Sequence, residues 1–141
     1  MIKRTRLPEN IVALLTRAEA YLQSRPDVAF AYLFGSLANS KPTPLSDVDI
    51  AVYLLDDLDI AEKKMEILGA LMNLLETDEI DLVILNTAPL PLKMKVLEHR
   101  KVIAENHPFL RHAYESLTMR KYFDFSIKEA GILERRFFHG R

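Results

Sequence analysis

The 141-residue chain contains no cysteine. Disulfide bonds and thiolate chemistry are therefore excluded, and the composition fits a reducing cytoplasm, where we expect the protein to work. No apolar run reaches the length of a transmembrane helix, and the basic residues near the N-terminus are not followed by the apolar segment of a secretory signal. We therefore expect neither secretion nor contact with a membrane.

The chain also lacks an excess of one charge. Its 19 Lys and Arg nearly balance its 20 Asp and Glu, so no global basic field predicts direct binding of nucleic acid. Locally the balance shifts. Eleven acidic residues against two lysines lie between Asp47 and Asp81, whereas seven basic against four acidic residues follow from His107 onward. The acidic middle suits a cation, and the basic end either faces an acidic partner or is a solvated helix face.

What remains is an ordinary globular composition with 49% hydrophobic and 28% charged residues. Apolar periodicity and turn residues predict helices and strands in alternation. The expected helices span residues 8–24, 59–76, 92–100 and 107 onward, and the expected strands span 28–34, 48–55, 80–85 and 101–105. This order predicts an α/β fold, with a small mixed, twisted sheet backed by helices on one side, the strand 48–55 in its centre and the strand 101–105 at an edge.

The most informative stretch begins where the apolar strand 28–34 ends. Gly35 allows a ligand to approach the backbone, and Ser36 offers a hydroxyl and an N–H group. Residues 36–39 are compatible with a short helix or turn whose N–H groups face an anion. Gly35 and Ser36 therefore predict a phosphate-binding turn, although taken alone they also fit an ordinary turn.

Two carboxylates open the next strand. Asp47 and Asp49 are two residues apart, so their side chains point to the same face of a strand. Burying like charges together without a counter-ion costs several kcal/mol, on the order of the penalties known for unpaired buried ions. Mg²⁺ takes carboxylate oxygens and often keeps substrate phosphates as further ligands. The pattern predicts a metal site beside the phosphate-binding turn.

Gly-Ser, ten residues and then Asp-x-Asp is a specific combination. In this motif the chain resembles the DNA polymerase beta-like nucleotidyltransferase superfamily. Its short length and the sequence Ser46-Asp47-Val48-Asp49-Ile50 resemble the minimal nucleotidyltransferase (MNT) branch of that superfamily. The resemblance in layout covers about residues 8 to 105. Many members of this branch are antitoxins paired with a ribonuclease toxin of the HEPN class.

The resemblance implies a site. Gly35, Ser36 and Ser46 are implied as nucleotide-binding residues, and Asp47 and Asp49 as catalytic residues and metal ligands. A third catalytic carboxylate is implied on the neighbouring strand, where Asp81 enters an apolar run and Asp78 and Glu79 are competing candidates. Two Mg²⁺ ions and ATP as substrate follow from the same resemblance. An aspartate at the edge of the strand is the structural alternative for Asp81.

One departure from the family concerns the phosphates. Many relatives carry Ala-Arg-Gly shortly after the Gly-Ser, where this chain has Ala38-Asn39-Ser40. Either a basic contact to the phosphates is missing or Lys41 replaces it. The chain also lacks the extra domain by which larger relatives hold an acceptor, so we expect the acceptor to come from another molecule.

Other polar residues have simpler interpretations. Asp56, Asp57 and Asp59 predict a solvated loop with a helix N-cap at Asp57 or Asp59, in preference to a second metal site. His99, near the end of a short helix, is interpreted as a C-terminal cap in preference to a ligand.

We expect two parts, a nucleotidyltransferase domain over residues 1–106 and a helical extension over residues 107–141. The extension is rich in aromatic side chains and either covers the core or meets a partner. The resemblance implies an antitoxin that transfers AMP from ATP to a tyrosine hydroxyl of its HEPN toxin. The alternatives are an antitoxin that neutralises by contact alone and a nucleotidyltransferase that acts on a small molecule such as an aminoglycoside.

Overall fold

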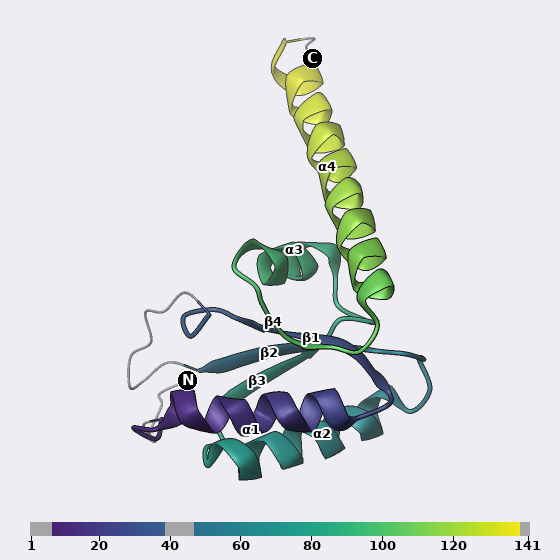
Figure 1. Cartoon of the computed structure of the whole chain (residues 1–141). Coiled ribbons are helices and arrows are strands. Elements are labelled where there is room, and N and C mark those ends of the chain that lie inside the picture. Colours follow the sequence, from purple (N-terminus) through teal and green to yellow (C-terminus); the bar gives the residue numbers. More distant parts are fainter. Residues whose placement is uncertain (1–6, 39–46, 139–141) are drawn as a thin grey trace.

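The structure is a computed structural model that describes residues 7–38 and 47–138, the last seven of them as backbone only. The elements follow in the predicted order (Figure 1). They are α1 (Ile11–Ser24), β1 (Val28–Phe34), β2 (Val48–Leu54), α2 (Ile60–Leu75), β3 (Ile80–Ile84), α3 (Leu90–Glu98), β4 (Lys101–Glu105) and α4 (Pro108–Phe138).

The four strands form one mixed sheet in the order β3-β2-β1-β4. β1 pairs antiparallel with both β2 and β4, and β2 pairs parallel with β3 across the α2 crossover. The predicted α/β fold is confirmed, as are the interior position of the second strand and the edge position of the last.

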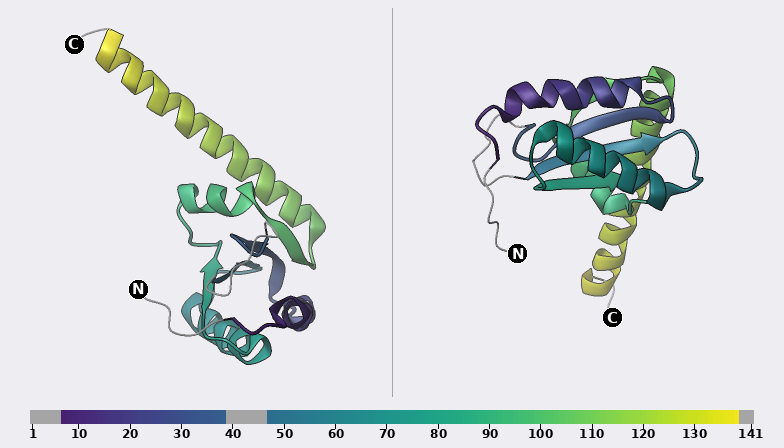
Figure 2. Two further views of the ribbon diagram at one scale, coloured as in Figure 1. Left: turned by 90° about the vertical axis from the view of Figure 1, so that its left-hand side faces the viewer. Right: turned by 90° about the horizontal axis from the view of Figure 1, so that it is seen from below.

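The prediction that helices back the sheet on one side is wrong, because they cover both faces (Figures 1 and 2). α1 and α2 lie on one face, where Leu22, Ile67 and Leu71 pack against alternate residues of the strands. α3 and the beginning of α4 cover the other face, where Phe30, Tyr32 and Val96 belong to a second apolar cluster. The reason is visible in β1, whose seven residues are all buried. A strand with no solvated side needs apolar cover on both faces.

α4 is anchored to the sheet at its beginning and then leaves the body of the protein (Figure 1). The Glu115 side chain is buried and accepts hydrogen bonds from Tyr32 Oη at 2.6 Å, Arg111 Nη1 at 2.8 Å and Arg100 Nε at 3.0 Å. These bonds connect α4 to β1 and to the turn before β4. From Met119 to residue 130, every side chain but Tyr122 is exposed.

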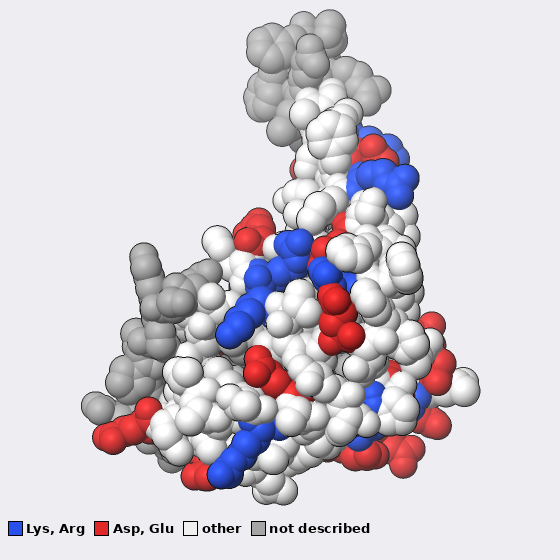
Figure 3. Space-filling model, viewed as in Figure 1, with Lys and Arg blue, Asp and Glu red and all other residues white. Residues whose placement is uncertain are grey.

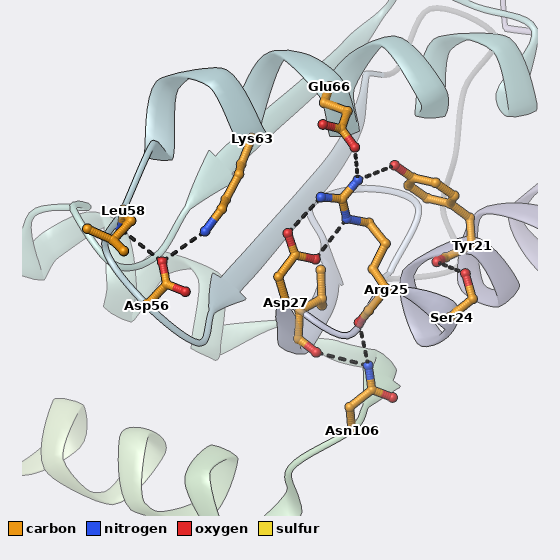
Figure 4. A network of polar contacts seen from close by, with 10 residues as sticks. Tyr21, Ser24, Arg25, Asp27, Asp56, Leu58, Lys63, Glu66 and Asn106 are labelled. Carbon is orange, nitrogen blue, oxygen red and sulfur yellow. Dashed lines mark hydrogen bonds and ion pairs between the residues drawn. The ribbon is translucent and has the colours of Figure 1, made fainter.

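A second polar network lies at the start of β1, at the end of the strand away from Gly35 (Figure 4). The Arg25 guanidinium pairs with Asp27 at 2.7 Å and Glu66 at 2.6 Å and also bonds the Tyr21 hydroxyl. Its hydrogen bonds hold the pKa of the Asp27 carboxyl below its ordinary value. The network ties α1, α2 and the start of β1 together, so the sheet is braced at one end while its other end carries the residues of the candidate site.

The acidic loop before α2 behaves largely as predicted. Asp59 is the N-cap residue of α2, but its side chain makes no capping hydrogen bond and its backbone is left-handed, with φ 53°. Asp56 accepts the Leu58 N–H at 2.9 Å and pairs with Lys63 at 2.8 Å. Asp57 accepts a hydrogen bond from Asn86 Nδ2 at 3.0 Å, so the loop is bonded both to the start of α2 and to the segment after β3.

Candidate active site

Asp49 and Asp81 are directly paired residues of the parallel strands β2 and β3. Their neighbours Ile50 and Leu82 belong to the core under α1 and α2. Because side chains alternate along a strand, the two carboxylates point to the opposite face, which α3 covers. Asp49 is half-buried and Asp81 is exposed. The register of one strand pair thus brings two of the three predicted carboxylates to the same place.

Gly35 stands against Asp49 at the end of β1. Its φ is +77°, a left-handed conformation that side chains disfavour. A Cβ atom at this position would lie 2.1 Å from the Asp49 carboxylate oxygen Oδ2, which is an impossible contact. Glycine is therefore required here twice, for the turn and for the space that the carboxylate occupies.

These residues share a pocket of about 270 Å³. The sheet contributes Phe34, Gly35, Asp49 and Asp81 to its lining, and α3 contributes Leu92, Lys95, Glu98 and His99. Pockets that enclose a whole drug-sized ligand usually measure about 300–1,000 Å³. The volume of this pocket lies just below that range, so the pocket can enclose part of a larger ligand.

The other predicted residues lie around the pocket. Asp47 directly precedes β2, is exposed and does not line the pocket. Ser36 follows Gly35, is half-buried and does not line it either. Ser46 and Lys41 lie outside the described residues. The pocket is also not lined by Asp78 and Glu79, the competing candidates for the third carboxylate, so its geometry favours Asp81.

Within residues 7–38 and 47–131, no group of three or more His, Asp or Glu side chains is arranged to hold a metal ion. The sheet instead offers the pocket two carboxylates, Asp49 and Asp81, and Glu98 of α3 brings a third to its lining. Mg²⁺ is usually held by one or two protein carboxylates together with substrate phosphates, and its preferred ligands are hard oxygens. The donor set fits one such ion, and the predicted participation of Asp47 and of a second ion stays a prediction.

Sequence reasoning missed the wall that α3 contributes. His99 is the C-cap residue of α3, as predicted, but it also lines the pocket with Lys95 and Glu98. The spacing of Lys95 and His99 (i, i+4) placed them on one helix face. What that face meets is decided by the packing of Val96 and Leu97 on the sheet, which the local sequence does not specify.

The fold and the pocket together are those of a small nucleotidyltransferase domain. Residues 17–108, about two thirds of the chain, match the family described as Polymerase beta, Nucleotidyltransferase. The chain belongs to this family. No curated protein gives a significant match to this chain.

Solved structures of toxin–antitoxin complexes resemble the chain over most of its length. A toxin–antitoxin structure with AMP-PNP is 26% identical over 91% of this chain and 97% of that one, with a TM-score of 0.66. The MntA–HepT toxin–antitoxin structure is 26% identical over 89% and 92%, with a TM-score of 0.59. An MNT antitoxin complex with tri-AMPylated HEPN toxin from Shewanella oneidensis is 25% identical over 89% and 91%, with a TM-score of 0.60.

None of the described helices is both long enough and apolar enough to cross a membrane.

On the face seen in Figure 3, basic side chains lie beside acidic ones between α3 and the sheet. This face therefore presents no field of one sign.

Proposed function

We propose that this chain is the antitoxin of an MNT–HEPN pair and that it transfers AMP from ATP to a tyrosine hydroxyl of its partner toxin. The observation that carries the proposal is the pairing of Asp49 with Asp81 beside Gly35 in one pocket. Its support from relatives is that one similar structure contains AMP-PNP and another contains a HEPN toxin that carries AMP.

The reaction is a substitution at the α-phosphorus of ATP. The tyrosine oxygen forms a bond to this phosphorus, the bond to the β-phosphate oxygen breaks, and pyrophosphate leaves with that electron pair. A phenol has a pKa near 10 in water, so its proton must be accepted as the bond forms. Asp81 is suited to accept this proton, because its carboxylate is exposed in the pocket and accepts no hydrogen bond from any described residue.

The remaining residues position the nucleotide. Gly35 brings the backbone close to the phosphates, because the position carries no side chain. Asp49 and Asp81 would hold Mg²⁺, which supplies charge stabilisation to the phosphates when bound. Ser36 and Ser46 remain candidate contacts to the nucleotide, and Asp47 a candidate further ligand. Positioning and charge stabilisation account for most of the catalysis of phosphoryl-type transfer.

The partner would dock in part on the projecting half of α4. Met119, Phe123 and Ile127 recur every four residues, so they form one apolar stripe on the helix, and they are 41%, 65% and 54% exposed. Exposed apolar patches of this kind mark interaction sites. A helical toxin can cover the stripe with an apolar helix face, as the helices of a bundle cover each other.

The proposal is tested by weighing the partner. The chain and its cognate HEPN protein are incubated with ATP and Mg²⁺, and the partner is analysed by intact mass spectrometry. We expect one or more AMP additions with the wild type and none with Asp49→Asn, whereas Asp78→Asn, a nearby acid outside the pocket, should behave as wild type. A partner that is inhibited without gaining mass would support the alternative, neutralisation by contact through α4.

A further inference from the structure

The wall of the pocket that α3 contributes carries hydrogen-bond donors opposite the two aspartates. Lys95 and His99 line the pocket together with Asp49 and Asp81. Both are exposed, and their i, i+4 spacing places them on the same face of the helix. The pocket therefore has one acidic side on the sheet and one side on α3 that can donate hydrogen bonds to an anion.

Lys95 differs from four other basic side chains of the protein in making no ion pair. Arg25, Lys63, Arg100 and Arg111 all form ion pairs. Lys95 makes no ion pair or hydrogen bond to any described residue, although Glu98 lies one helical turn away. An ammonium that lines a pocket and is not used by the fold can bind a ligand without breaking an existing bond.

The charge balance of the lining explains why such a group is needed. Asp49, Asp81 and Glu98 bring three carboxylates to the pocket, against the single ammonium of Lys95. A polyphosphate entering this lining meets repulsion from the carboxylates, and one divalent ion between the aspartates offsets only part of it. A cation on the opposite wall is therefore the group that makes binding of a phosphate favourable.

We propose that Lys95 binds the β- and γ-phosphates of the nucleotide and that a ring N–H of His99 donates a second hydrogen bond to them. The inference rests on the proposed function and deepens it. It assigns to α3 the basic contact that the sequence lacks at Ala38-Asn39-Ser40. A lysine binds phosphate as a point charge, so its contribution depends on charge and is screened by salt.

The test compares the affinities of ATP, ADP and AMP for the full chain, measured by titration calorimetry with Mg²⁺. Lys95→Gln should weaken ATP binding about tenfold or more, the usual scale for a charge-assisted hydrogen bond, with a smaller loss for ADP and almost none for AMP. Lys95→Arg should retain most of the affinity. His99→Ala should weaken ATP binding several-fold, whereas His99→Gln, which keeps an N–H donor, should weaken it less.

Lys93→Gln is the matched control, because Lys93 is on the same helix but lies 5.8 Å from the centre of the Tyr114 ring and does not line the pocket. It should leave all three affinities unchanged. The inference is overturned if Lys95→Gln binds ATP normally, if it loses AMP as strongly as ATP, or if Lys93→Gln has the same effect. A wild-type chain that binds no ATP would instead overturn the proposed function itself, and the inference with it.

Discussion

The Asp49 and Asp81 carboxylates lie side by side because β2 and β3 are parallel and these two residues are paired in their register. A shift of one residue in this pairing would turn one carboxylate into the core under α1 and α2. The register is held by apolar residues on the other face, among them Ile50, Val52 and Ile84. The core thus fixes the geometry of the site, and substitutions in the pocket should change chemistry more than folding.

Asp81→Asn should lower the rate of AMP transfer by about 10²–10⁴-fold, the usual contribution of a general base, with a smaller change in the affinity for Mg-ATP, because Asp49 and the phosphates still hold the ion. The physical reason is that the amide cannot accept the phenol proton. Single-turnover kinetics and calorimetry of the same protein separate the two effects. Asp78→Asn serves as the control, and a normal transfer rate in Asp81→Asn would reduce Asp81 to a structural residue.

Gly35→Ala should abolish ATP binding. The new Cβ would lie 2.1 Å from the Asp49 carboxylate oxygen, and the φ of +77° would be strained, so the turn and the carboxylate must both move. Gly69→Ala is the matched control, since nothing lies within 4 Å of its added Cβ and it is in α2. This control should raise the stability by about 0.5–1 kcal/mol. Titration with Mg-ATP and thermal melting distinguish the two variants. Unchanged ATP binding by Gly35→Ala would show that the nucleotide does not bind at this turn.

The anchoring of α4 should be sensitive to acid through Glu115. Burial raises the pKa of its carboxyl, but the hydrogen bonds from Tyr32, Arg111 and Arg100 outweigh burial and leave the pKa below the ordinary value. A carboxyl with a depressed folded pKa stabilises the fold fully above its unfolded value of 4.5, and this contribution is lost as the pH falls through the folded value.

Glu115→Gln should therefore lower the free energy of unfolding by about 1–3 kcal/mol at neutral pH and flatten its decrease in acid, since the amide carries no titrating charge. Denaturant unfolding from pH 7 to pH 3 measures both effects. Ser116→Ala, an exposed neighbour on the same helix, is the control. If the free energy of unfolding decreases equally in acid for Glu115→Gln and the wild type, other carboxyls cause the decrease.

The apolar stripe of α4 should bind the toxin. Phe123→Ser with Ile127→Ser should weaken the complex at least about a hundredfold, because the loss of two apolar side chains from an interface costs about 1.5–3 kcal/mol each. Affinity for Mg-ATP should stay the same, since neither residue lines the pocket. Phe109→Ser is a fitting comparison because Phe109 is 90% exposed but lies at the beginning of α4. If the double variant binds toxin normally, the docking surface lies elsewhere.

Much of the fold was predictable from local sequence. The apolar run of β1 and the periodic apolar residues of α1 and α2 predict their elements because burial in each depends on its own pattern. The coverage of both faces was missed, although seven consecutive apolar residues in β1 already indicated it.

The site was predictable only in part. The Gly35-Ser36 turn and the paired aspartates can be found by motif, because their spacing is set along the chain. The close contact of Gly35 with Asp49, and the place of Lys95 opposite them, depend on how β1, β2 and α3 pack in space. No local pattern encodes these distances, so the sequence could not show them.

The central claim is that inhibition occurs by transfer of AMP and not by contact. The most direct measurement is to react the toxin with this protein, ATP and Mg²⁺, separate the toxin under denaturing conditions, refold it, and determine its mass and ribonuclease activity. The account predicts a toxin that carries AMP on tyrosine and stays inactive alone, and an unmodified, active toxin from the reaction with Asp49→Asn. A re-isolated toxin that is unmodified and fully active after reaction with the wild-type protein would contradict it.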